Sequence, residues 1–230
     1  KGQHVTRREV LPAVVRNNGT KEWHNEQGQL HREHGPAFTH PDGTEAWYRH
    51  GDRHRDNGPA VIDGITKEQK WYCEGKLHRE NGPAIVYEDG AREYYQKGLL
   101  HREDGPARVE ITDNVAVSYA EYRIRGELHR EDGPAIERDT GEKEYYRHGK
   151  LHREDGPAIE RPDGTKEYYL NGEKITAAEL CKSLGISSIA QTESRTPEAL
   201  EKAATEDLRI AKESFPQHFQ SEKNKAYLEN

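Results

Sequence analysis

Residues 151–158 read Leu-His-Arg-Glu-Asp-Gly-Pro-Ala, and close variants of this stretch recur along most of the chain. Aligned on Gly-Pro-Ala, the copies are separated by successive intervals of 23, 24, 23, 28 and 23 residues. The six glycines are Gly35, Gly58, Gly82, Gly105, Gly133 and Gly156. A degenerate seventh copy lies upstream at residues 8–13. Self-similarity at a fixed period of this size is the signature of a repeat array.

Each copy carries the signals of a β-hairpin. Residues 159–161 form an extended segment, residues 162–165 form a Pro-Asp-Gly-Thr turn in which glycine supplies a positive φ, and residues 166–170 favour a return strand. Asn171-Gly172 predicts a further turn into the next copy. The connections leave no room for crossover helices. We therefore expect a mainly β fold, an elongated antiparallel meander of about seven tandem 23-residue hairpin repeats with a C-terminal helical tail.

A pair of aromatic positions precedes each closing glycine. The first position holds Trp23, Trp47, Trp71, Tyr94, Tyr122, Tyr145 and Tyr168. The second holds Tyr48, Tyr72, Tyr95, Tyr146 and Tyr169, with His24 and Arg123 as exceptions. Neighbouring residues of a strand point to opposite faces, so the pairs predict two aromatic ladders. Packing is the first interpretation, and a ligand platform on the more exposed ladder is the alternative.

The interval between Gly105 and Gly133 is longer than the others and carries extra residues around 111–115. A longer hairpin explains it, and insertions in repeat arrays often lie at a contact face.

The run Tyr48-x-x-Gly51-x-x-His54 recurs at residues 72–78, 95–101 and 146–152. It resembles part of the MORN repeat, and the full Leu-His-Arg-x-x-Gly-Pro-Ala unit looks like a variant repeat of bacterial and phage proteins. The resemblance covers about residues 5–172. It implies a twisted β-hairpin sheet used for protein or membrane association, without catalytic residues. The chain departs from the MORN pattern in having arginine after the histidine, as at Arg55.

The repeated sequence His-Arg-acid, which occurs in six copies, has the side chains best suited to binding or catalysis. Its arginines are Arg32, Arg55, Arg79, Arg102, Arg130 and Arg153. In a structural interpretation, arginine binds carbonyls and carboxylates and lies on an aromatic ring, while histidine donates to a carbonyl. In a recognition interpretation, the arginines with Trp47, Trp71, Tyr94 and Tyr122 bind an acidic partner or phosphates. A metal or enzyme site is the weakest reading, because one histidine per copy does not gather ligands around a point.

Composition excludes several classes of function. Hydrophobic residues make up 31% of the chain and charged residues 33%, which suits a thin array that buries one face per unit. The net charge of −7 argues against non-specific binding to nucleic acid. Cys73 and Cys181 occupy unrelated positions, which predicts no disulfide framework and a reducing compartment. No segment has the length and apolarity of a membrane span.

The repeats end near residue 175. Thr176-Ala177-Ala178-Glu179 matches a capping box and predicts a helix that ends near Leu184, with Gly185 after it. A second helix should begin at Pro197. Its apolar stripe comprises Leu200, Ala204, Leu208, Ala211 and Phe215. The first helix should cover the last repeat, because an open sheet edge needs a cap.

These observations divide the chain into a repeat domain, residues 1–175, and a helical module, residues 176–230. The expected function is a non-catalytic protein-interaction scaffold without cofactor or metal, such as a bacterial effector or phage protein that binds a host protein. The alternatives are sequestration of an anionic ligand or nucleic acid by the arginine and aromatic residues, and a targeting arm for a toxin-like C-terminal module. We expect a cytoplasmic location, with delivery into a host cell as a variant, and the helical tail could join copies into a homo-oligomer.

Overall fold

The computed structural model describes residues 14–112 and 116–185, together with residues 202, 205, 206, 208 and 209. The described part is mainly β, with 25 strands in antiparallel hairpins, a single short helix and no closed barrel. The predicted fold class is thus confirmed. The degenerate copy at residues 8–13 and the tip of the long hairpin at residues 113–115 lie outside the described residues.

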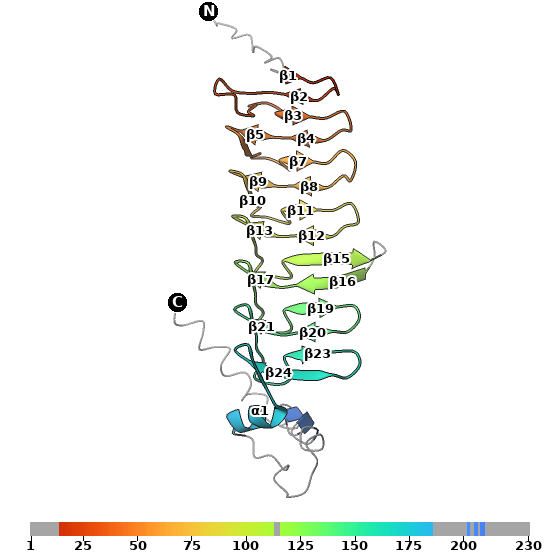
Figure 1. Ribbon diagram of the computed structural model, residues 1–230, viewed down its shortest axis with the longest axis vertical. Coiled ribbons are helices and arrows are strands. Elements are labelled where there is room, and N and C mark those ends of the chain that lie inside the picture. The colour runs from red at the N-terminus through yellow and green to blue at the C-terminus, as the bar shows by residue number, and fades with distance from the viewer. Residues whose placement is uncertain (1–13, 113–115, 186–201, 203–204, 207, 210–230) are drawn as a thin grey trace, which may run out of the picture. The chain divides into compact units, whose positions relative to one another are not determined.

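The chain forms two compact units, Lys1–Arg102 with Ala107–Ala116, and Glu103–Pro106 with Val117–Asn230. In each unit, the main-sheet strands pair antiparallel in chain order (Figure 1). Those of the first unit are β1 (Val14–Val15), β2 (Lys21–Glu22), β3 (Phe38–Thr39), β4 (Glu45–Ala46), β7 (Val61–Ile62), β8 (Gln69–Lys70), β11 (Ile85–Val86), β12 (Arg92–Glu93) and β15 (Arg108–Thr112). Those of the second are β16 (Ala116–Glu121), β19 (Ile136–Arg138), β20 (Lys143–Glu144), β23 (Ile159–Glu160), β24 (Lys166–Leu170) and β25 (Glu173–Ile175).

A second set of hairpins lies beside each main sheet. They are β5 (Tyr48–Arg49) with β6 (Asp52–Arg53), β9 (Tyr72–Cys73) with β10 (Lys76–Leu77), β13 (Tyr95–Gln96) with β14 (Leu99–Leu100), β17 (Arg123–Ile124) with β18 (Glu127–Leu128), and β21 (Tyr146–Arg147) with β22 (Lys150–Leu151). The prediction of two strands per copy was therefore wrong for most copies, which have four short strands. The reason is visible at Trp47, where the backbone changes partners. Its N–H donates to Ala60 O, 2.8 Å away in the main sheet, while its carbonyl accepts from His54 N, 3.1 Å away.

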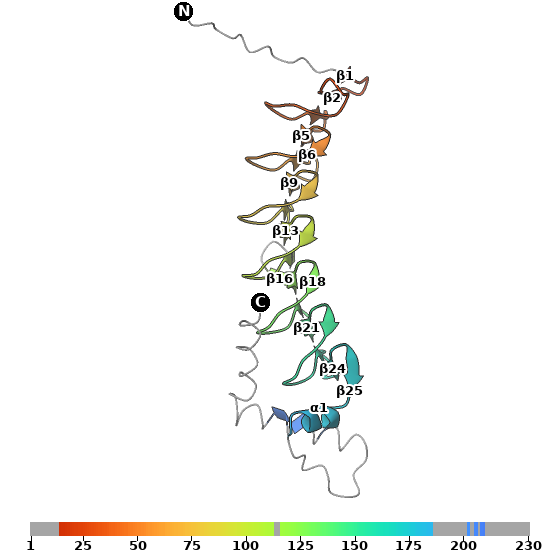
Figure 2. The same ribbon diagram turned by 90° about the vertical axis from the view of Figure 1, so that its left-hand side faces the viewer.

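The two kinds of hairpin use different turns. In the main sheet, His40 N–H donates to Thr44 O at 2.9 Å, and Gly43 has φ +92°. This is a type I turn followed by a glycine bulge, as the Pro-Asp-Gly-Thr sequence predicts. The small hairpins turn through two left-handed residues, such as His50 at φ +51° and Gly51 at φ +89°, which is the type I′ pattern. Figure 2 shows these small hairpins following one another within each unit.

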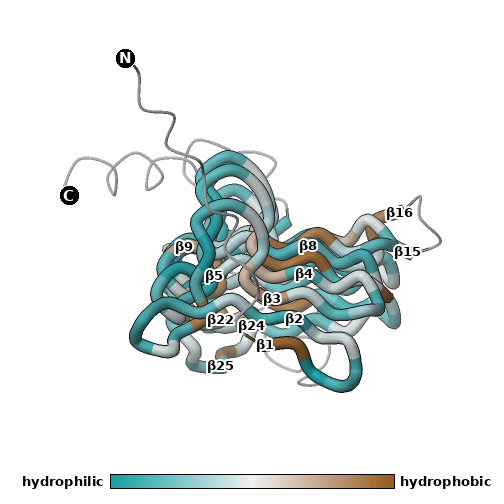
Figure 3. Tube along the Cα trace, turned by 90° about the horizontal axis from the view of Figure 1, so that it is seen from above, coloured by the Kyte–Doolittle hydropathy of each residue, from teal (hydrophilic) through white to brown (hydrophobic). Residues whose placement is uncertain are grey.

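The core is thin and is made largely of one alanine per copy. The alanine of Gly-Pro-Ala is 0% exposed in all six copies. The residue after it is also buried in three copies, as Ile85, Ile136 and Ile159. In the view from above, apolar positions lie on main-sheet strands such as β1, whose two residues are valines (Figure 3). A few small side chains per copy therefore suffice, in agreement with the low apolar content of the sequence.

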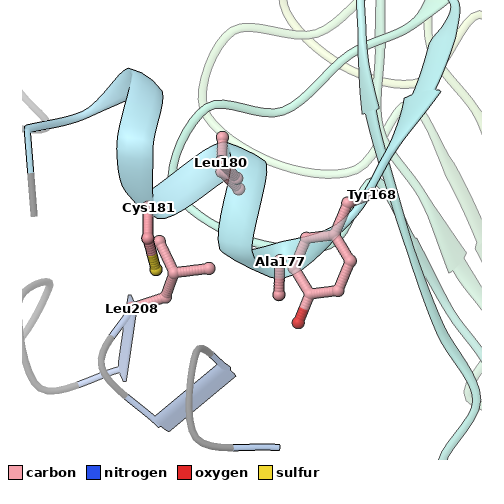
Figure 4. Packing of buried hydrophobic residues seen from close by; sticks show 5 residues of the cluster. All are labelled: Tyr168, Ala177, Leu180, Cys181 and Leu208. Atoms are coloured by element: carbon pink, nitrogen blue, oxygen red, sulfur yellow. The ribbon is translucent and has the colours of Figure 1, made fainter. Parts of the chain in front are cut away.

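The described helix covers the last repeat, as the capping argument predicts. Helix α1 (Ala177–Ser183) starts at Thr176, which forms the predicted capping box with Glu179. Its residues Leu180 and Cys181 are 0% exposed and pack with Tyr168 and Leu208. Figure 4 shows this cluster.

The structure describes the predicted second helix only in part. The stripe residues Leu200, Ala204, Ala211 and Phe215 lie outside the described residues. Tyr168 Oη lies 2.8 Å from Thr205 Oγ1, so residue 205 also approaches the last repeat. The predicted boundary between residues 175 and 176 remains a prediction, since α1 belongs to the second unit.

Both cysteines are free thiols. Among the described residues, the helical segments have neither the length nor the apolar composition that a membrane span requires.

Candidate functional site

The arginine of each His-Arg element lies over the ring of the first aromatic residue of its own copy. The distances from Cζ to the ring centroid are 3.8 to 4.0 Å, which is the range of a close cation–π contact. The six pairs are Arg32–Trp23, Arg55–Trp47, Arg79–Trp71, Arg102–Tyr94, Arg130–Tyr122 and Arg153–Tyr145. The structural interpretation of this element therefore accounts for one face of every guanidinium.

The same guanidinium holds the following loop. Arg55 Nη1 donates to Pro59 O at 3.0 Å, and Arg153 Nη1 donates to Pro157 O at 3.0 Å. Arg32, Arg79 and Arg130 make the same bond to Pro36, Pro83 and Pro134. Glycine precedes the proline because the guanidinium occupies the space where a side chain would begin. A Cβ on Gly58, whose φ is +130°, would lie 3.1 Å from Arg55 Cζ.

In five of the elements, the histidine links its copy to the next one. Nδ1 of the ring accepts the backbone N–H of the first of the two left-handed turn residues in the following copy. Examples are His31 from His50 at 3.1 Å and His152 from Asn171 at 3.0 Å. The same bond joins His54 to Glu74, His78 to Lys97 and His129 to His148, each at 3.2 Å. The sequence argument expected histidine to donate to a carbonyl. That role is corrected, since the partner is a donor and Nδ1 must accept.

The backbone of the neighbouring arginine reinforces this link. Arg153 N–H donates to Tyr169 O of the next copy at 3.1 Å, and Arg130 N–H donates to Tyr146 O at 3.2 Å. His-Arg is thus a two-residue junction, in which histidine and the arginine backbone bind the next copy while the arginine side chain binds its own. We call this set of contacts the His-Arg junction.

Accepting at Nδ1 requires an unprotonated imidazole, so we expect acid to open the junction formed by His129. Burial, followed by the positive charge of His148 and Arg147, lowers the pKa of His129, although Glu131 opposes the shift. The folded state therefore binds the proton less readily than the unfolded chain. The stability that this junction contributes is complete above the unfolded-state pKa near 6.5 and is lost as pH falls through the lower folded-state pKa.

We therefore predict that the urea midpoint of the second unit falls between pH 7 and 5, and falls less in His129→Gln. Glutamine offers an uncharged acceptor at this position, so its junction does not respond to the proton. The matched control is His34→Gln on an exposed loop, which should titrate like the parent. An identical pH profile for His129→Gln and the parent protein would contradict the role given to this ring.

A file of partly buried glutamates, which sequence analysis missed, occupies the other aromatic ladder. It comprises Glu22, Glu93, Glu121, Glu144 and Glu167, each immediately before the first aromatic residue of a copy. Tyr95 and Tyr146 donate their hydroxyls to Glu93 and Glu144 at 2.8 and 2.9 Å. Hydrogen bonds from Lys174 and Arg161 lower the pKa of Glu167 to about 2. The recurrence of glutamate before the aromatic pair was the available signal, hidden by Ala46 and Lys70 in two copies.

Only part of the predicted binding set is brought together in one open site. A groove of about 600 Å³ lies between two successive copies of the first unit, and Arg32, Trp47 and Arg55 line it. Each of the remaining predicted residues contacts the ring or guanidinium partner of its own copy. Those residues are Trp71, Tyr94, Tyr122, Arg79, Arg102, Arg130 and Arg153.

The groove also contains residues that do not recur in every copy. Arg49 is half-exposed and pairs with Asp56, its Nη2 lying 2.5 Å from Oδ2. His54 Nε2 lies 2.8 Å from the other oxygen of Asp56, and the pKa of Asp56 is lowered first by His54 and then by Arg49. The rings of His31 and His50 stack with centroids 4.5 Å apart. The groove therefore presents cationic, aromatic and acidic groups side by side.

The side chains of the groove are charged and aromatic. Within the described residues, no three histidine, cysteine or acidic side chains gather in a way that could hold a metal ion. The contacts of the groove are ion pairs and ring stacking, in which no nucleophile is paired with a base.

No protein-family model and no curated protein sequence matches the chain significantly.

Proposed function

We propose that this protein is a non-catalytic interaction scaffold that binds another protein through the groove lined by side chains from residues 31–57. The repeated residues are engaged in building the array, as the His-Arg junctions illustrate. In the groove, residues that differ between copies, such as Arg49 and His50, lie beside the recurring aromatic side chains and would make this surface selective. The MORN-like repeat pattern supports the same function class.

The groove carries this proposal because it gathers the residue types that dominate binding energies at protein interfaces. Tryptophan, tyrosine and arginine are enriched among interface hot spots. Trp47, Tyr48 and Arg49 are consecutive in the chain and all line the groove. Trp47 and Tyr48 are partly accessible, and the side chain of Arg49 is 51% exposed. A partner would find rigid aromatic surface beside a charge pair that it can compete for.

Sequestration of a phosphate or nucleic acid by the arginine file is less well supported. Arg32 and Arg55 already stack on a ring and donate to a proline carbonyl. Glu33 and Asp56 add negative charge to the same groove. A net charge of −7 opposes the approach of a polyanion. We therefore propose a protein partner that offers both a carboxylate and an apolar side chain.

The helical tail is better explained as a cap of the repeat array than as a toxin-like module. Helix α1 covers the last repeat, which is the function of a cap in a repeat array. A cytoplasmic location, delivery into a host cell, and oligomerisation through the tail remain proposals of the same scaffold model.

Reversing the charge of Arg49 tests the groove. We expect Arg49→Glu to weaken the binding of the partner about thirtyfold, the loss that corresponds to an interface hot spot of about 2 kcal/mol. The measurement is quantitative mass spectrometry of proteins retained from bacterial and eukaryotic lysates by the immobilised full chain. Gln96→Glu is the matched control, because Gln96 occupies the equivalent position of β13. If both variants retain the same proteins in the same amounts as the parent, the groove is not the binding site.

A further inference from the structure

Four Asn-Gly dipeptides occur in the described chain, and their chemistry depends on the glycine nitrogen. They are Asn18-Gly19, Asn57-Gly58, Asn81-Gly82 and Asn171-Gly172. In such a pair, the backbone nitrogen of glycine can attack Cγ of the asparagine side chain, because glycine has no side chain to hinder the approach. All four asparagines are exposed, so exposure does not distinguish them.

Two of the four glycine nitrogens are occupied by hydrogen bonds. Gly19 N–H donates to Arg16 O at 2.8 Å, and Gly172 N–H donates to Leu151 O at 2.8 Å. Asn18 is further held because its Oδ1 accepts Thr20 N–H at 3.1 Å. A nitrogen whose proton is held by a carbonyl is a poor nucleophile, since it must lose that bond and that proton before it can attack.

The other two nitrogens are open. Gly58 and Gly82 N–H make no hydrogen bond to any residue that the structure describes, and neither do the side chains of Asn57 and Asn81. Each glycine also lies under a guanidinium, with Arg55 Cζ and Arg79 Cζ 3.1 and 3.3 Å from the place of its missing Cβ. A fixed positive charge beside the peptide favours the deprotonated nitrogen and the oxyanion that forms during attack.

We propose that Asn57 and Asn81 are sites of self-modification, at which the folded protein converts asparagine to aspartate. The Gly58 nitrogen loses its proton and bonds to Asn57 Cγ. The side-chain amide leaves as ammonia, and a five-membered succinimide remains. Water then opens the ring, which gives aspartate or, by cleavage at the other carbonyl, isoaspartate. Asn81 and Gly82 follow the same course, and water is the co-reactant.

The product has a defined place in the fold. The equivalent position holds aspartate in later copies, and there it binds the arginine of its own copy. Arg130 Nε donates to Asp132 at 3.0 Å, and Arg153 Nε donates to Asp155 at 2.6 Å. Conversion of Asn57 would supply the same carboxylate to Arg55. The aspartate product, unlike isoaspartate, would thus complete two arginine contacts that the encoded sequence leaves unmade.

Peptide mapping by mass spectrometry tests the proposal on the intact, folded chain incubated at neutral to mildly basic pH. We expect the NH₂-to-OH mass change to accumulate several-fold faster at residues 57 and 81 than at residues 18 and 171. In denaturant, where the hydrogen bonds and guanidinium contacts are gone, the four rates should converge. Asn57→Gln should abolish the change at residue 57 and leave residue 81 unaffected. Equal rates at the four sites in the folded protein, or no change at 57 and 81, would overturn it.

A second measurement addresses the consequence of the reaction. Asn57→Asp and Asn81→Asp reproduce the aspartate product without the chemistry. Both variants should melt at or above the temperature of the unmodified parent, because the new carboxylate meets an arginine Nε. Asn18→Asp is the matched control for an added charge elsewhere. A lower melting temperature in both test variants, with the control unchanged, would refute the claim that modification completes the arginine contacts.

Discussion

Replacing Gly64 with alanine should lower the free energy of unfolding of the first unit by about 3 kcal/mol or more, at the upper end of overpacking effects. Gly64 lies in the turn after β7 and contacts the turn of the preceding copy. A Cβ there would lie 2.1 Å from Asp42 O and 2.4 Å from Thr44 N. These are backbone atoms, so no side-chain rotation can relieve the overlap. The turns would have to separate, and the bond from Gly64 N–H to Thr44 Oγ1 would be lost.

Urea denaturation of the full chain measures this effect, and Gly164→Ala serves as the control. Gly164 has φ +86° and no atom within 4 Å of an added Cβ, so alanine meets only the left-handed backbone penalty of roughly 1–2 kcal/mol. We therefore expect Gly64→Ala to be clearly the more destabilised variant. If the two variants have the same midpoint, the contact between adjacent turns does not limit the packing of copies.

The second large effect is expected at Arg153, where lysine should not substitute for arginine. Arg153 is 12% exposed, stacks on Tyr145, donates to Pro157 O, and pairs with Asp155 and Glu160. Arg153→Ala should cost roughly 3 kcal/mol, since it removes a desolvated cation–π contact and several charged hydrogen bonds. Arg153→Lys should recover little of this loss, because an ammonium group cannot lie flat on the ring and bind the other partners together.

The role of the repeated arginine is decided by comparing substitutions of Arg153 with a substitution of Arg49. Arg49→Ala removes a half-exposed guanidinium that has one carboxylate partner, so its unfolding free energy should stay within about 0.5 kcal/mol of the parent. Thermal melting followed by circular dichroism gives both values. An Arg153→Lys variant that is as stable as the parent would show that charge alone, and not the geometry of the guanidinium, holds the loop that follows Arg153.

The fold was predictable from the sequence to the extent that local turn chemistry determines it. Asp42-Gly43 and Asn171-Gly172 specify their turns directly, and Thr176 with Glu179 specifies the start of α1. The break at Trp47 was not predictable in the same way. Residues 45–48 have no proline or glycine, and the strand ends there because the backbone exchanges one hydrogen-bonding partner for another. That exchange depends on contacts between copies, which lie about one period apart in the chain.

The contacts of the repeated arginine were predictable from the sequence, whereas the position of the open groove was not. Arginine lying on an aromatic ring and binding a carbonyl was anticipated at Arg55, and the structure shows both contacts. The position of the open groove depends on Arg49 and His50, which do not recur in the same form in the neighbouring copy. An argument built on what repeats could not single out these residues, because their significance comes from the three-dimensional meeting of two copies.

The His-Arg junction has a consequence for how such a protein can change over generations. At each of the five described junctions, one copy offers an imidazole acceptor and a backbone N–H, and the next copy offers a turn N–H and a tyrosine carbonyl. These groups are the same at every described junction, so a gene that gains or loses one whole period rejoins two ends that already fit. Copy number can therefore vary without a new interface having to evolve, whereas a change of a few residues within a period breaks the match on both sides.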